Sequence, residues 1–525
     1  MFGNHAVTGL VKDTMADDPY KYQFGFGNHH ATEAIPGALP ANGTNLPQKA
    51  RYGLYAEHLN GTSFISSRES VSNVWMYRER PGAPHRPLRQ VQQHNEIETC
   101  FLPTNPNVSF TPQAHTWGPL PAPKTNASGR GGSTTFVRGL KTIGGYGDAT
   151  LKEGLAVHQY AFDADMDRQA FVNHDGDLLL VPQQGVLDIK TELGNLRIKP
   201  GMISVLPAGI RFAISIVRLP SQSHNNHDNP APHAAGYALE VFGTRFALPE
   251  LGVLGANGLA HVRDFEYPVA AFDLEPPGTL PPFEVTVKLA GRLFAYAQPY
   301  TPFNVVAWHG RHAPFRYDLA RFAHLSANTD QLDPTAYCVL TAPSKWPGVS
   351  VVEFCVFGEK WAVAGDTLRI PYYHRTMATE LCGVIKGVYR GSVRPLEAGG
   401  MSFEQSYMPH GESYEAYARE REAEHEPVKV AQGFMSFMFH VPAHLGLTKW
   451  AMEDHPDIRP ERAGLWDSFR GHLLDHIDDA NASLSKAGMP TLQIHPLTPP
   501  ESPSGTIVPE DDGEPGLGDV PMDEQ

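Results

Sequence analysis

The chain has 525 residues, which is enough for two or more domains with buried cores. Its formal charge of −15, without any run of Lys or Arg, argues against a nucleic-acid-binding protein. We recognise no signal peptide, no ER or peroxisomal address, and no apolar run of the roughly 20 residues that a membrane span needs. The four cysteines form no CxxC pair, which predicts reduced thiols in a cytoplasmic protein.

The first half of the chain reads as strands. Residues 1–20 are expected to form a flexible leader and residues 21–285 an N-terminal β-sandwich domain. The clearest segment is 176–215, where short apolar or alternating runs each end at Pro-Gly, Gly-Asn or Gly, a pattern typical of antiparallel barrels and sandwiches. Because this segment contains no His or Cys, we expect the N-terminal barrel to be structural and to hold no metal.

A hairpin is predicted inside that segment, over residues 185–201. Leu187 and Ile189 would lie on one face, because side chains alternate along a strand. The opposite face would carry Val186, Asp188 and Lys190.

Residues 218–236 interrupt the strands and predict a flexible insertion. Its histidines, His224, His227 and His233, could be taken for metal ligands. Nothing in the pattern fixes their geometry, so a solvated polar insertion is the favoured interpretation.

A second strand-rich block, residues 286–487, is expected to form a C-terminal domain. The segments 349–358 and 433–442 predict buried strands, because they are apolar on both faces. One amphipathic helix is predicted near the end of the block, over 466–479, and packed on the body. Its apolar positions at helical spacing are Trp466, Phe469, Leu473 and Ile477. Residues 488–525 are acidic, rich in Pro and poor in aromatics, which predicts a disordered tail.

Two histidines and a glutamate in the second block suggest a metal site. His374 and Glu380 stand six apart in "RIPYYHRTMATELCG", and His410 follows in "YMPHGES". Ligand atoms of one metal lie within about 3 Å of one another, since metal–ligand distances are near 2 Å. A straight strand would separate residues 374 and 380 by roughly 20 Å, and a helix would turn them about 240° apart. The chain must therefore bend back between them for such a site to exist.

Spacing alone is weak support, because the chain has 25 histidines and the alternative is three unconnected surface residues. The residue types favour the metal interpretation. Two neutral imidazoles and one carboxylate match the facial triad of non-heme Fe(II) oxygenases, which leaves positions for substrate and O2.

The chain also resembles the homogentisate 1,2-dioxygenase family over roughly residues 20–455. In the first 81 residues the motifs appear in order as "YQFGFGN", "GALP", "YGLYAEHLNGTSF" and "WMYRERP". Later come "DGDLLLVPQ", "GANGLAHVRDF", "PFNVVAWHG", "VLTAPS", "PYYHR", "MPHG" and "LTKW". This resemblance implies a mainly β, cupin-like antiparallel barrel or sandwich with few helices, whose C-terminal part is a metal-binding jelly-roll.

The resemblance also implies site residues. His374, Glu380 and His410 match the family's Fe(II) ligands, and His410 would also lie at the substrate. His309 in "VVAWHG" matches the acid/base histidine, and Tyr389 in "KGVYRG" matches a substrate-contacting tyrosine. Taken alone, His309 would be a core histidine and Tyr389 an ordinary strand aromatic. The implied partners are a small aromatic substrate and O2, in a homo-oligomer built as a trimer or hexamer.

Two positions depart from the family pattern. Glu404 stands where the family has a histidine, six residues before the last ligand, and would repel an anionic substrate unless protonated or turned away. Thr376 replaces an expected Asn. We therefore keep three alternatives: a paralogue that cleaves another substituted hydroquinone, a catalytically silent barrel that binds a small phenol, and a Zn or Mn isomerase.

Overall fold

The computed structural model describes residues 18–41, 49–91, 96–123, 134–218, 232–250, 259–276, 278–324, 337–362, 368–389, 394–424, 426–461 and 464–493. The chain separates into two compact units, residues 1–467 and 468–525, and each is described by itself. Most of the predicted leader, insertion and tail lies outside the described residues.

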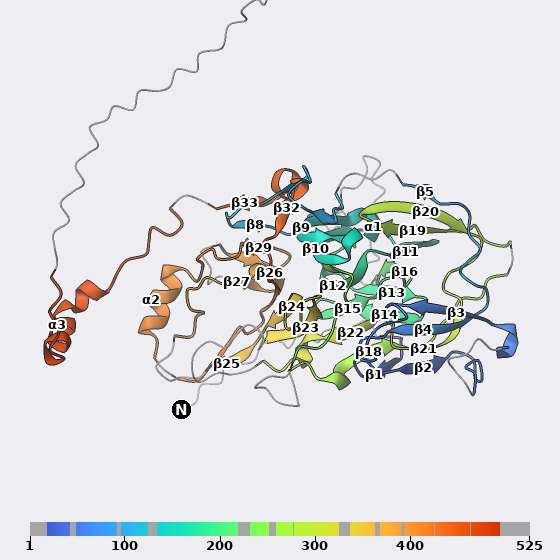
Figure 1. The fold of residues 1–525 in the computed structure, drawn as a ribbon, viewed down its shortest axis with the longest axis horizontal. Helices are drawn as coiled ribbons and strands as arrows, with labels where there is room; N and C mark the ends of the chain where they lie inside the picture. Colours follow the sequence, from blue (N-terminus) through green and yellow to red (C-terminus); the bar gives the residue numbers. More distant parts are fainter. Residues whose placement is uncertain are drawn as a thin grey trace, which may run out of the picture. The chain divides into compact units, whose positions relative to one another are not determined.

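The predicted fold class, mainly β with few helices, is confirmed (Figure 1). The described α-helices are α1 (Phe136–Gly139), α2 (Tyr414–Glu422) and α3 (Ile477–Lys486). Single turns of 3-10 or π-helix occur at Arg51–Gly53, Ala149–Leu151, Val262–Asp264, Leu319–Arg321, Trp450–Asp454 and Leu473–His476. Within the described ranges no helix is long and apolar enough to cross a membrane.

A central sheet of 11 described strands runs through the first unit. Its strands in spatial order are β1 (Tyr22–Phe24), β18 (Phe265–Pro268), β22 (Phe315–Asp318), β15 (Met202–Leu206), β12 (Gly176–Gln184), β17 (Ala234–Phe242), β10 (Glu153–Phe162), β9 (Leu140–Asp148), β32 (Gly446–Thr448) and β7 (Val108–Ser109), with β6 (Cys100–Phe101) also on β9.

Two seven-stranded sheets flank the central sheet in Figure 1. The first flanking sheet is β14 (Gly194–Ile198), β13 (Leu187–Thr191), β16 (Phe212–Ile216), β11 (Gln169–Asn173), β19 (Phe283–Leu289), β20 (Arg292–Gln298) and β5 (Arg89–Gln90). The second flanking sheet is β23 (Cys338–Pro343), β24 (Ser350–Phe357), β31 (Met435–Val441), β26 (Thr379–Lys386), β29 (Met401–Glu404), β8 (His115–Trp117) and β33 (Ile458–Pro460).

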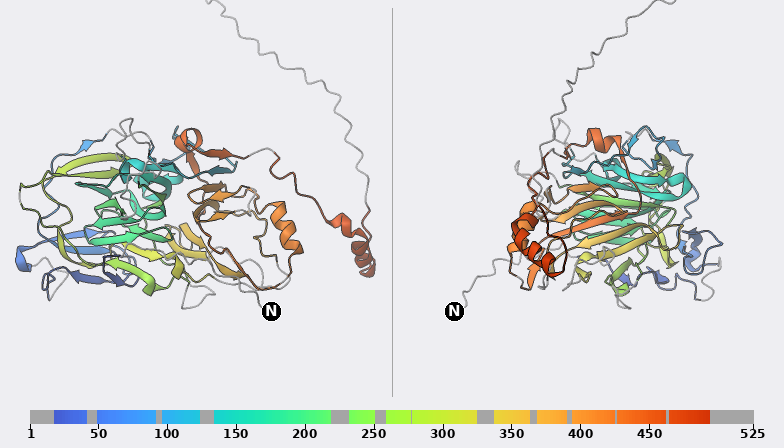
Figure 2. Two further views of the ribbon diagram at one scale, coloured as in Figure 1. Left: turned by 180° about the vertical axis from the view of Figure 1, so that it is seen from behind. Right: turned by 60° about the vertical axis from the view of Figure 1, so that its left-hand side comes forward.

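The remaining described strands of the first unit form three smaller sheets. A four-stranded sheet contains β2 (His30–Glu33), β21 (Val305–Gly310), β4 (Asn73–Arg78) and β3 (Tyr55–Asn60). Two strand pairs are β25 (Lys360–Ala362) with β30 (Val428–Val430), and β27 (Val388–Tyr389) with β28 (Leu396–Glu397). Figure 2 shows the four-stranded sheet at one end of the unit and the second flanking sheet toward the other.

Both faces of the central sheet are buried, which explains its long apolar runs. Along β12, Leu179 and Val181 pack into one hydrophobic cluster, whereas Leu178 and Leu180 pack into another. The first cluster also takes residues from the second flanking sheet, and the second takes residues from the first flanking sheet. The central sheet therefore packs against the second flanking sheet through the first cluster.

The predicted hairpin is confirmed, since β13 pairs with β14 and alternates between buried and half-buried residues. The strands predicted at 349–358 and 433–442 are confirmed as β24 and β31. The pairings between described strands are antiparallel except that of β11 with β19, which is parallel. That pairing and the pairing of β21 with β4 join segments from the two sides of the predicted domain boundary at residue 285. The position of the boundary itself stays a prediction.

The predicted helix over 466–479 is wrong in its position. The helix α3 begins at Ile477, after a single 3-10 turn, and Leu473 is 62% exposed. Gly471 lies in the middle of the predicted span and disfavours helix. Asp478 and Asp479 favour a helix that starts beside them, since acidic side chains stabilise the first turn.

A buried ionic cluster joins the central sheet to the first flanking sheet. The Lys288 ammonium lies 2.7 Å from Asp175 Oδ2 and 2.8 Å from both carboxylate oxygens of Glu240. Burial alone would raise the pKa of Glu240, but Lys288 and His158 outweigh it and lower the pKa to about 2. Glu240 is therefore a carboxylate held inside the core by its cation.

Candidate metal centre

The chain bends sharply between His374 and Glu380, as their spacing required. His374 forms an isolated antiparallel bridge with His410, with both backbone N–O distances at 3.1 Å. Glu380 is the second residue of β26 and lies on the face opposite Leu381, which is fully buried in the core. Within the bend the Thr376 hydroxyl accepts a hydrogen bond from the amide of Ala378 (3.2 Å). Thr376, the replacement for Asn, therefore stabilises the turn that brings the two side chains together.

The backbone of the loop that carries His410 packs closely against the ring of Tyr373. A Cβ at Gly411 would lie 2.3 Å from Tyr373 Cδ1, so only glycine allows the two segments to approach. Tyr407 adopts a φ of 64°, a left-handed conformation that costs a non-glycine residue roughly 1–2 kcal/mol. The hydroxyl of Ser413 then caps α2 by accepting from the amide of Ala416 at 3.2 Å. Helix α2 thus anchors the loop on its far side.

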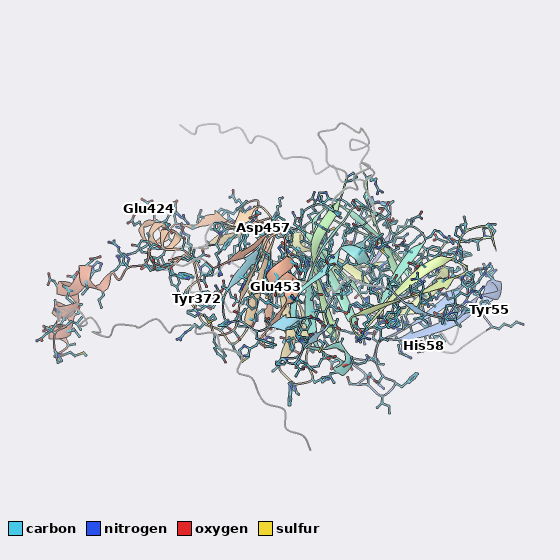
Figure 3. The ribbon with its side chains drawn as sticks, turned by 90° about the horizontal axis from the view of Figure 1, so that it is seen from above. Tyr55, His58, Tyr372, Glu424, Glu453 and Asp457 are labelled. Atoms are coloured by element: carbon cyan, nitrogen blue, oxygen red, sulfur yellow. The ribbon has the colours of Figure 1, made fainter. Side chains whose placement is uncertain are left out.

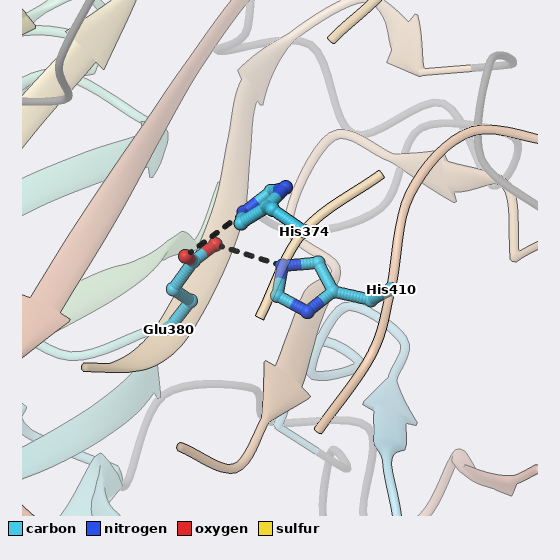
Figure 4. Close-up of side chains that lie close together, drawn as sticks. All are labelled: His374, Glu380 and His410. Atoms are coloured by element: carbon cyan, nitrogen blue, oxygen red, sulfur yellow. Dashed lines mark ion pairs between the residues drawn. The ribbon is translucent and has the colours of Figure 1, made fainter. Parts of the chain in front are cut away.

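The three side chains meet as the sequence analysis expected (Figure 4). His374 Nε2 lies 3.5 Å from one carboxylate oxygen of Glu380, and His410 Nε2 lies 3.4 Å from the other. One ligand atom from each residue lies within 4.8 Å of the others. The separations of 3.5 and 3.4 Å are close to those of ligand atoms that each lie about 2 Å from one cation.

Both histidines direct the same ring nitrogen, Nε2, toward Glu380. His374 Nδ1 donates to the carbonyl of Tyr372 (2.9 Å), and His410 Nδ1 donates to that of Met408 (3.0 Å). A carbonyl can only accept, so each Nδ1 carries the proton and each Nε2 keeps its lone pair. This backbone support of the second nitrogen is typical of metal-ligating histidines.

The charges at this cluster also suit a cation. Burial alone would raise the pKa of Glu380, but the two imidazoles lower it to about 2. Burial would lower the pKa of His410, yet the carboxylate raises it. His410 Nε2 is buried and makes no well-aligned hydrogen bond. The residues present therefore fit a divalent metal held by two imidazoles and one carboxylate.

Glu404 lies beside this cluster, but its charge is compensated. It stands directly opposite Glu380 in the pairing of β29 with β26, so the two side chains share a face. The guanidinium of Arg394 forms an ion pair with Glu404. The charge of Arg394 also acts on His410. The repulsion expected from Glu404 is therefore offset by Arg394, which the sequence analysis did not single out.

We expect Arg394→Met to lower the free energy of unfolding by about 2–3 kcal/mol. This loss is smaller than the loss expected when one partner of a fully buried ion pair is removed. The loss leaves the Glu404 carboxylate, only 14% exposed, without its cation. Urea denaturation of the single variants and of Arg394→Met/Glu404→Gln measures the coupling. Equal losses in the single and the double variant would contradict the pairing.

His440 is a second residue beside the cluster that no sequence motif indicated. It lies opposite Glu380 on the other side, in β31, and its Nδ1 is 3.2 Å from Glu353. The residues Glu353, His440, Glu380 and Glu404 thus form one row across four strands. Strand pairing alone reveals this row, because the four residues are far apart in sequence.

Tyr389 is connected to the His410 loop. Its hydroxyl donates to Glu412, two residues after His410, and its ring stacks on Phe434 with centroids 5.7 Å apart. Burial raises the pKa of Tyr389 and of Glu412. The predicted contact of Tyr389 with substrate stays a prediction.

His309 is not brought to the other site residues within one chain. It lies in β21 of the four-stranded sheet and is 1% exposed. Figure 3 labels Tyr372, beside His374, and His58, in the same sheet as His309, toward opposite ends of the first unit. The role of His309 therefore stays a prediction.

A cavity of about 830 Å³ lies away from the metal-site residues, none of which lines it. Its lining includes four cationic side chains and four carboxylates, so the charges balance. The charged residues are Lys152, Arg245, Arg311, Lys345, Glu69, Glu153, Asp175 and Asp177. Because the charges of the lining balance, they favour neither an anionic nor a cationic ligand.

A mainly β fold with a cluster of two histidines and one carboxylate defines a β-sheet protein with a candidate metal centre. The chain belongs to the homogentisate 1,2-dioxygenase family. The N-terminal model of that family matches residues 21–319, and its C-terminal model matches residues 320–473.

Named relatives cover most of the chain. The homogentisate 1,2-dioxygenase of Caenorhabditis elegans is 40% identical over 447 residues, 84% of this chain and 95% of that protein. Those of Drosophila melanogaster and Mus musculus are 40% and 38% identical, covering 86% of this chain and 98% and 97% of those proteins. Among solved structures, a cupin 2 conserved barrel domain protein from Leptotrichia buccalis covers 57% of this chain and 88% of its own at 10% identity, with a TM-score of 0.23.

Proposed function

We propose that the chain is an Fe(II) dioxygenase that opens the ring of homogentisate with O2 to give maleylacetoacetate, in tyrosine and phenylalanine breakdown. The observation that carries the proposal is the convergence of His374 Nε2, His410 Nε2 and the Glu380 carboxylate in a chain of this family. The silent-barrel alternative has no support from any observation, and a silent barrel has no need of this cluster.

The proposed metal is Fe(II), held by His374, Glu380 and His410. When bound, Fe(II) supplies the electron transfer that lets O2 react with an aromatic ring despite the spin barrier. The facial arrangement leaves coordination positions for substrate and O2. Arg394 offsets the charge of Glu404, so a carboxylate-bearing substrate can approach. The main reason to prefer another hydroquinone is thereby removed.

The other residues would handle protons and orientation. His309 is suited to take the phenol proton, because an imidazole has a pKa near working pH. Tyr389 would orient the ring through its hydroxyl, or hold the His410 loop through Glu412. Opening the ring beside the side chain creates one new carboxylate, so one proton is released in each turnover.

The deciding experiment is O2 uptake by protein loaded anaerobically with Fe(II). Homogentisate, gentisate and hydroquinone are compared under the same conditions. We expect stoichiometric uptake with homogentisate alone. Uptake only with another substrate would replace the proposed substrate, whereas protein that binds no iron would overturn the proposed metal centre. Loading with Zn or Mn tests the isomerase alternative.

We propose that His309 acts on the triad of a second copy, in a trimer or hexamer. His309 lies in the same sheet as His58, which Figure 3 labels toward the opposite end of the first unit from Tyr372, beside the triad. The described surface beside the triad also exposes large side chains of the kind that oligomer contacts bury. These are Tyr372, Tyr373, Met377 and Tyr407, at 50%, 44%, 56% and 61% exposure.

Mixing two inactive variants tests this arrangement. His309→Ala and Glu380→Gln are unfolded and refolded together, so that their chains can share oligomers. We expect measurable O2 uptake in the mixture, because some sites combine an intact His309 with an intact triad. Each variant refolded alone is the control, and a mixture as inactive as either would contradict a shared site.

We expect Tyr389→Phe to lower kcat/KM by roughly tenfold, about the value of one hydrogen bond. The substitution removes only the hydroxyl that donates to Glu412. Iron content is measured beside activity, because unchanged iron excludes simple loss of the metal. An unchanged kcat/KM would show that the hydroxyl has no role.

We propose a cytoplasmic location. The four cysteines form no disulfide, although Cys338 and Cys355 lie directly opposite each other in neighbouring strands. Such thiols suit a reducing compartment. Fractionation of source cells tests this proposal. We expect the protein in the cytosolic fraction, and recovery in an organelle would contradict it.

A further inference from the structure

A second histidine contacts His309. His29 Nε2 lies 3.0 Å from His309 Nδ1, with ring centroids 5.2 Å apart and planes tilted by 31°. The register of β2 against β21 places Ala31 opposite His309, which brings the residue just before β2 against the imidazole. The two rings therefore form a direct hydrogen bond across 280 residues of sequence.

The two rings lie in different surroundings. His309 is 1% exposed and faces the ring of Tyr77, with centroids 6.1 Å apart. His29 is exposed at the surface, and the charged or titratable groups that act on it are Arg311 and the neighbouring His30. Solvent thus reaches one end of the pair, and the other end is in the protein interior.

Only one proton can lie between two neutral imidazoles. If His309 donates from Nδ1, its Nε2 carries the lone pair and can act as a base. If His29 donates instead, the proton of His309 sits on Nε2 and the ring cannot accept another. The direction of this single hydrogen bond therefore decides whether His309 can take a proton at Nε2.

We propose that His29 is a positioning residue that accepts the hydrogen bond of His309 Nδ1–H and so presents the lone pair of His309 Nε2 to the substrate. This inference rests on the proposed role of His309. His29 also stabilises the imidazolium that forms when Nε2 takes the phenol proton, because Nδ1–H keeps an acceptor. The proton moves from the substrate oxygen to Nε2, and no bond within the pair is broken.

The arrangement predicts an acid limit to activity. Partial burial and the charge of Arg311 lower the pKa of His29 below its ordinary value of 6.5, so the ring is neutral at pH 7. As the pH falls through that pKa, His29 gains a proton and must donate to His309 Nδ1. His309 then holds its proton on Nε2, and kcat falls with it.

Three variants of the iron-loaded enzyme test the proposal. We expect His29→Phe to lower kcat about 10- to 100-fold, the range for losing a group that orients an imidazole, with little change in KM. His29→Glu, whose carboxylate accepts from Nδ1–H over a wider pH range, should retain kcat and extend activity to lower pH. His58→Gln is the matched control, because His58 stacks on Trp75 in the same sheet and should leave the pH profile unchanged.

A readout independent of activity is the tautomer of His309, observed by ¹⁵N NMR of histidine-labelled protein. The signal is assigned by its loss in His309→Gln. We expect the Nδ1–H form in the parent and a mixture of forms in His29→Phe. An Nε2–H form in the parent, or full kcat with an unchanged acid limit in His29→Phe, would overturn the proposal. A parent that shows the Nδ1–H form but consumes no O2 would instead refute the proposed function.

Discussion

Glu380→Gln should remove both the bound iron and the O2 uptake of the protein. The amide keeps the size of the side chain but loses the single negative charge of the donor set. We expect metal affinity to fall by more than about 100-fold, the upper end for residues that only support a ligand. The measurement is iron per chain after anaerobic loading and desalting, with O2 uptake on the same sample.

The matched control is Glu404→Gln. Glu404 lies directly opposite Glu380 on the same face, so it reports the effect of removing a neighbouring charge without removing a ligand. We expect this control to keep one iron per chain. Equal iron retention by Glu380→Gln would show that the carboxylate is no ligand, and thermal unfolding of both variants checks that the fold survives.

The second large effect is expected in the core. Lys288→Met should lower the free energy of unfolding by about 3–5 kcal/mol, the cost of leaving a buried charge without its partner. Lys288 is 1% exposed and contacts both oxygens of Glu240. Asp175 keeps backbone amides of residues 290 and 291 as donors, at 2.6 and 3.0 Å, so Glu240 carries most of the loss. Urea denaturation measures the change.

Lys190→Met is the control for this substitution. Lys190 also pairs with an aspartate, Asp273, but its side chain is 43% exposed, so we expect a loss below about 1 kcal/mol. Similar losses in the two variants would mean that burial does not set the strength of these pairs.

The pH dependence of the Lys288 variant follows from Glu240. Its pKa in the folded chain is about 2, below the ordinary 4.5, so this stabilisation is complete above pH 4.5 and is lost as the pH falls through 2. Without Lys288, burial raises the pKa of Glu240. Protonation of Glu240 then removes the unpaired buried charge, so the loss of stability caused by Lys288→Met should shrink as the pH falls, which urea unfolding of variant and parent between pH 3 and 7 would show.

The positions of the strands could be predicted from the sequence better than the partners with which they pair. Turn residues and alternation placed the hairpin of β13 and β14 correctly, because both signals are local. The partner of a strand is not local information, so the parallel pairing of β11 with β19 was not foreseen. The helix was misplaced because four apolar residues at helical spacing outweighed Gly471, although the first turn of α3 actually starts at Ile477.

The three residues of the cluster could be chosen from their chemical types together with the family resemblance, but their surroundings could not be predicted. The requirement for a bend between His374 and Glu380 followed from their separation alone. The contributions of Arg394 and His440 depend on strand register and on loop geometry, and neither leaves a motif in the sequence. The remoteness of His309 from the triad likewise depends on the three-dimensional arrangement.

The sheet pairings have a consequence for synthesis of the chain. The central sheet joins β1, at residues 22–24, to β32, at residues 446–448, and the sheet of the metal centre joins β8 to β33. The central sheet cannot close until residues near 448 have left the ribosome, and the metal-centre sheet cannot close until residues near 460 have done so. Assembly dominated by such distant contacts is slow, and incomplete chains expose apolar strand edges. Nascent chains of this protein should therefore depend on chaperones, and truncation before β33 should prevent formation of the complete metal-centre sheet.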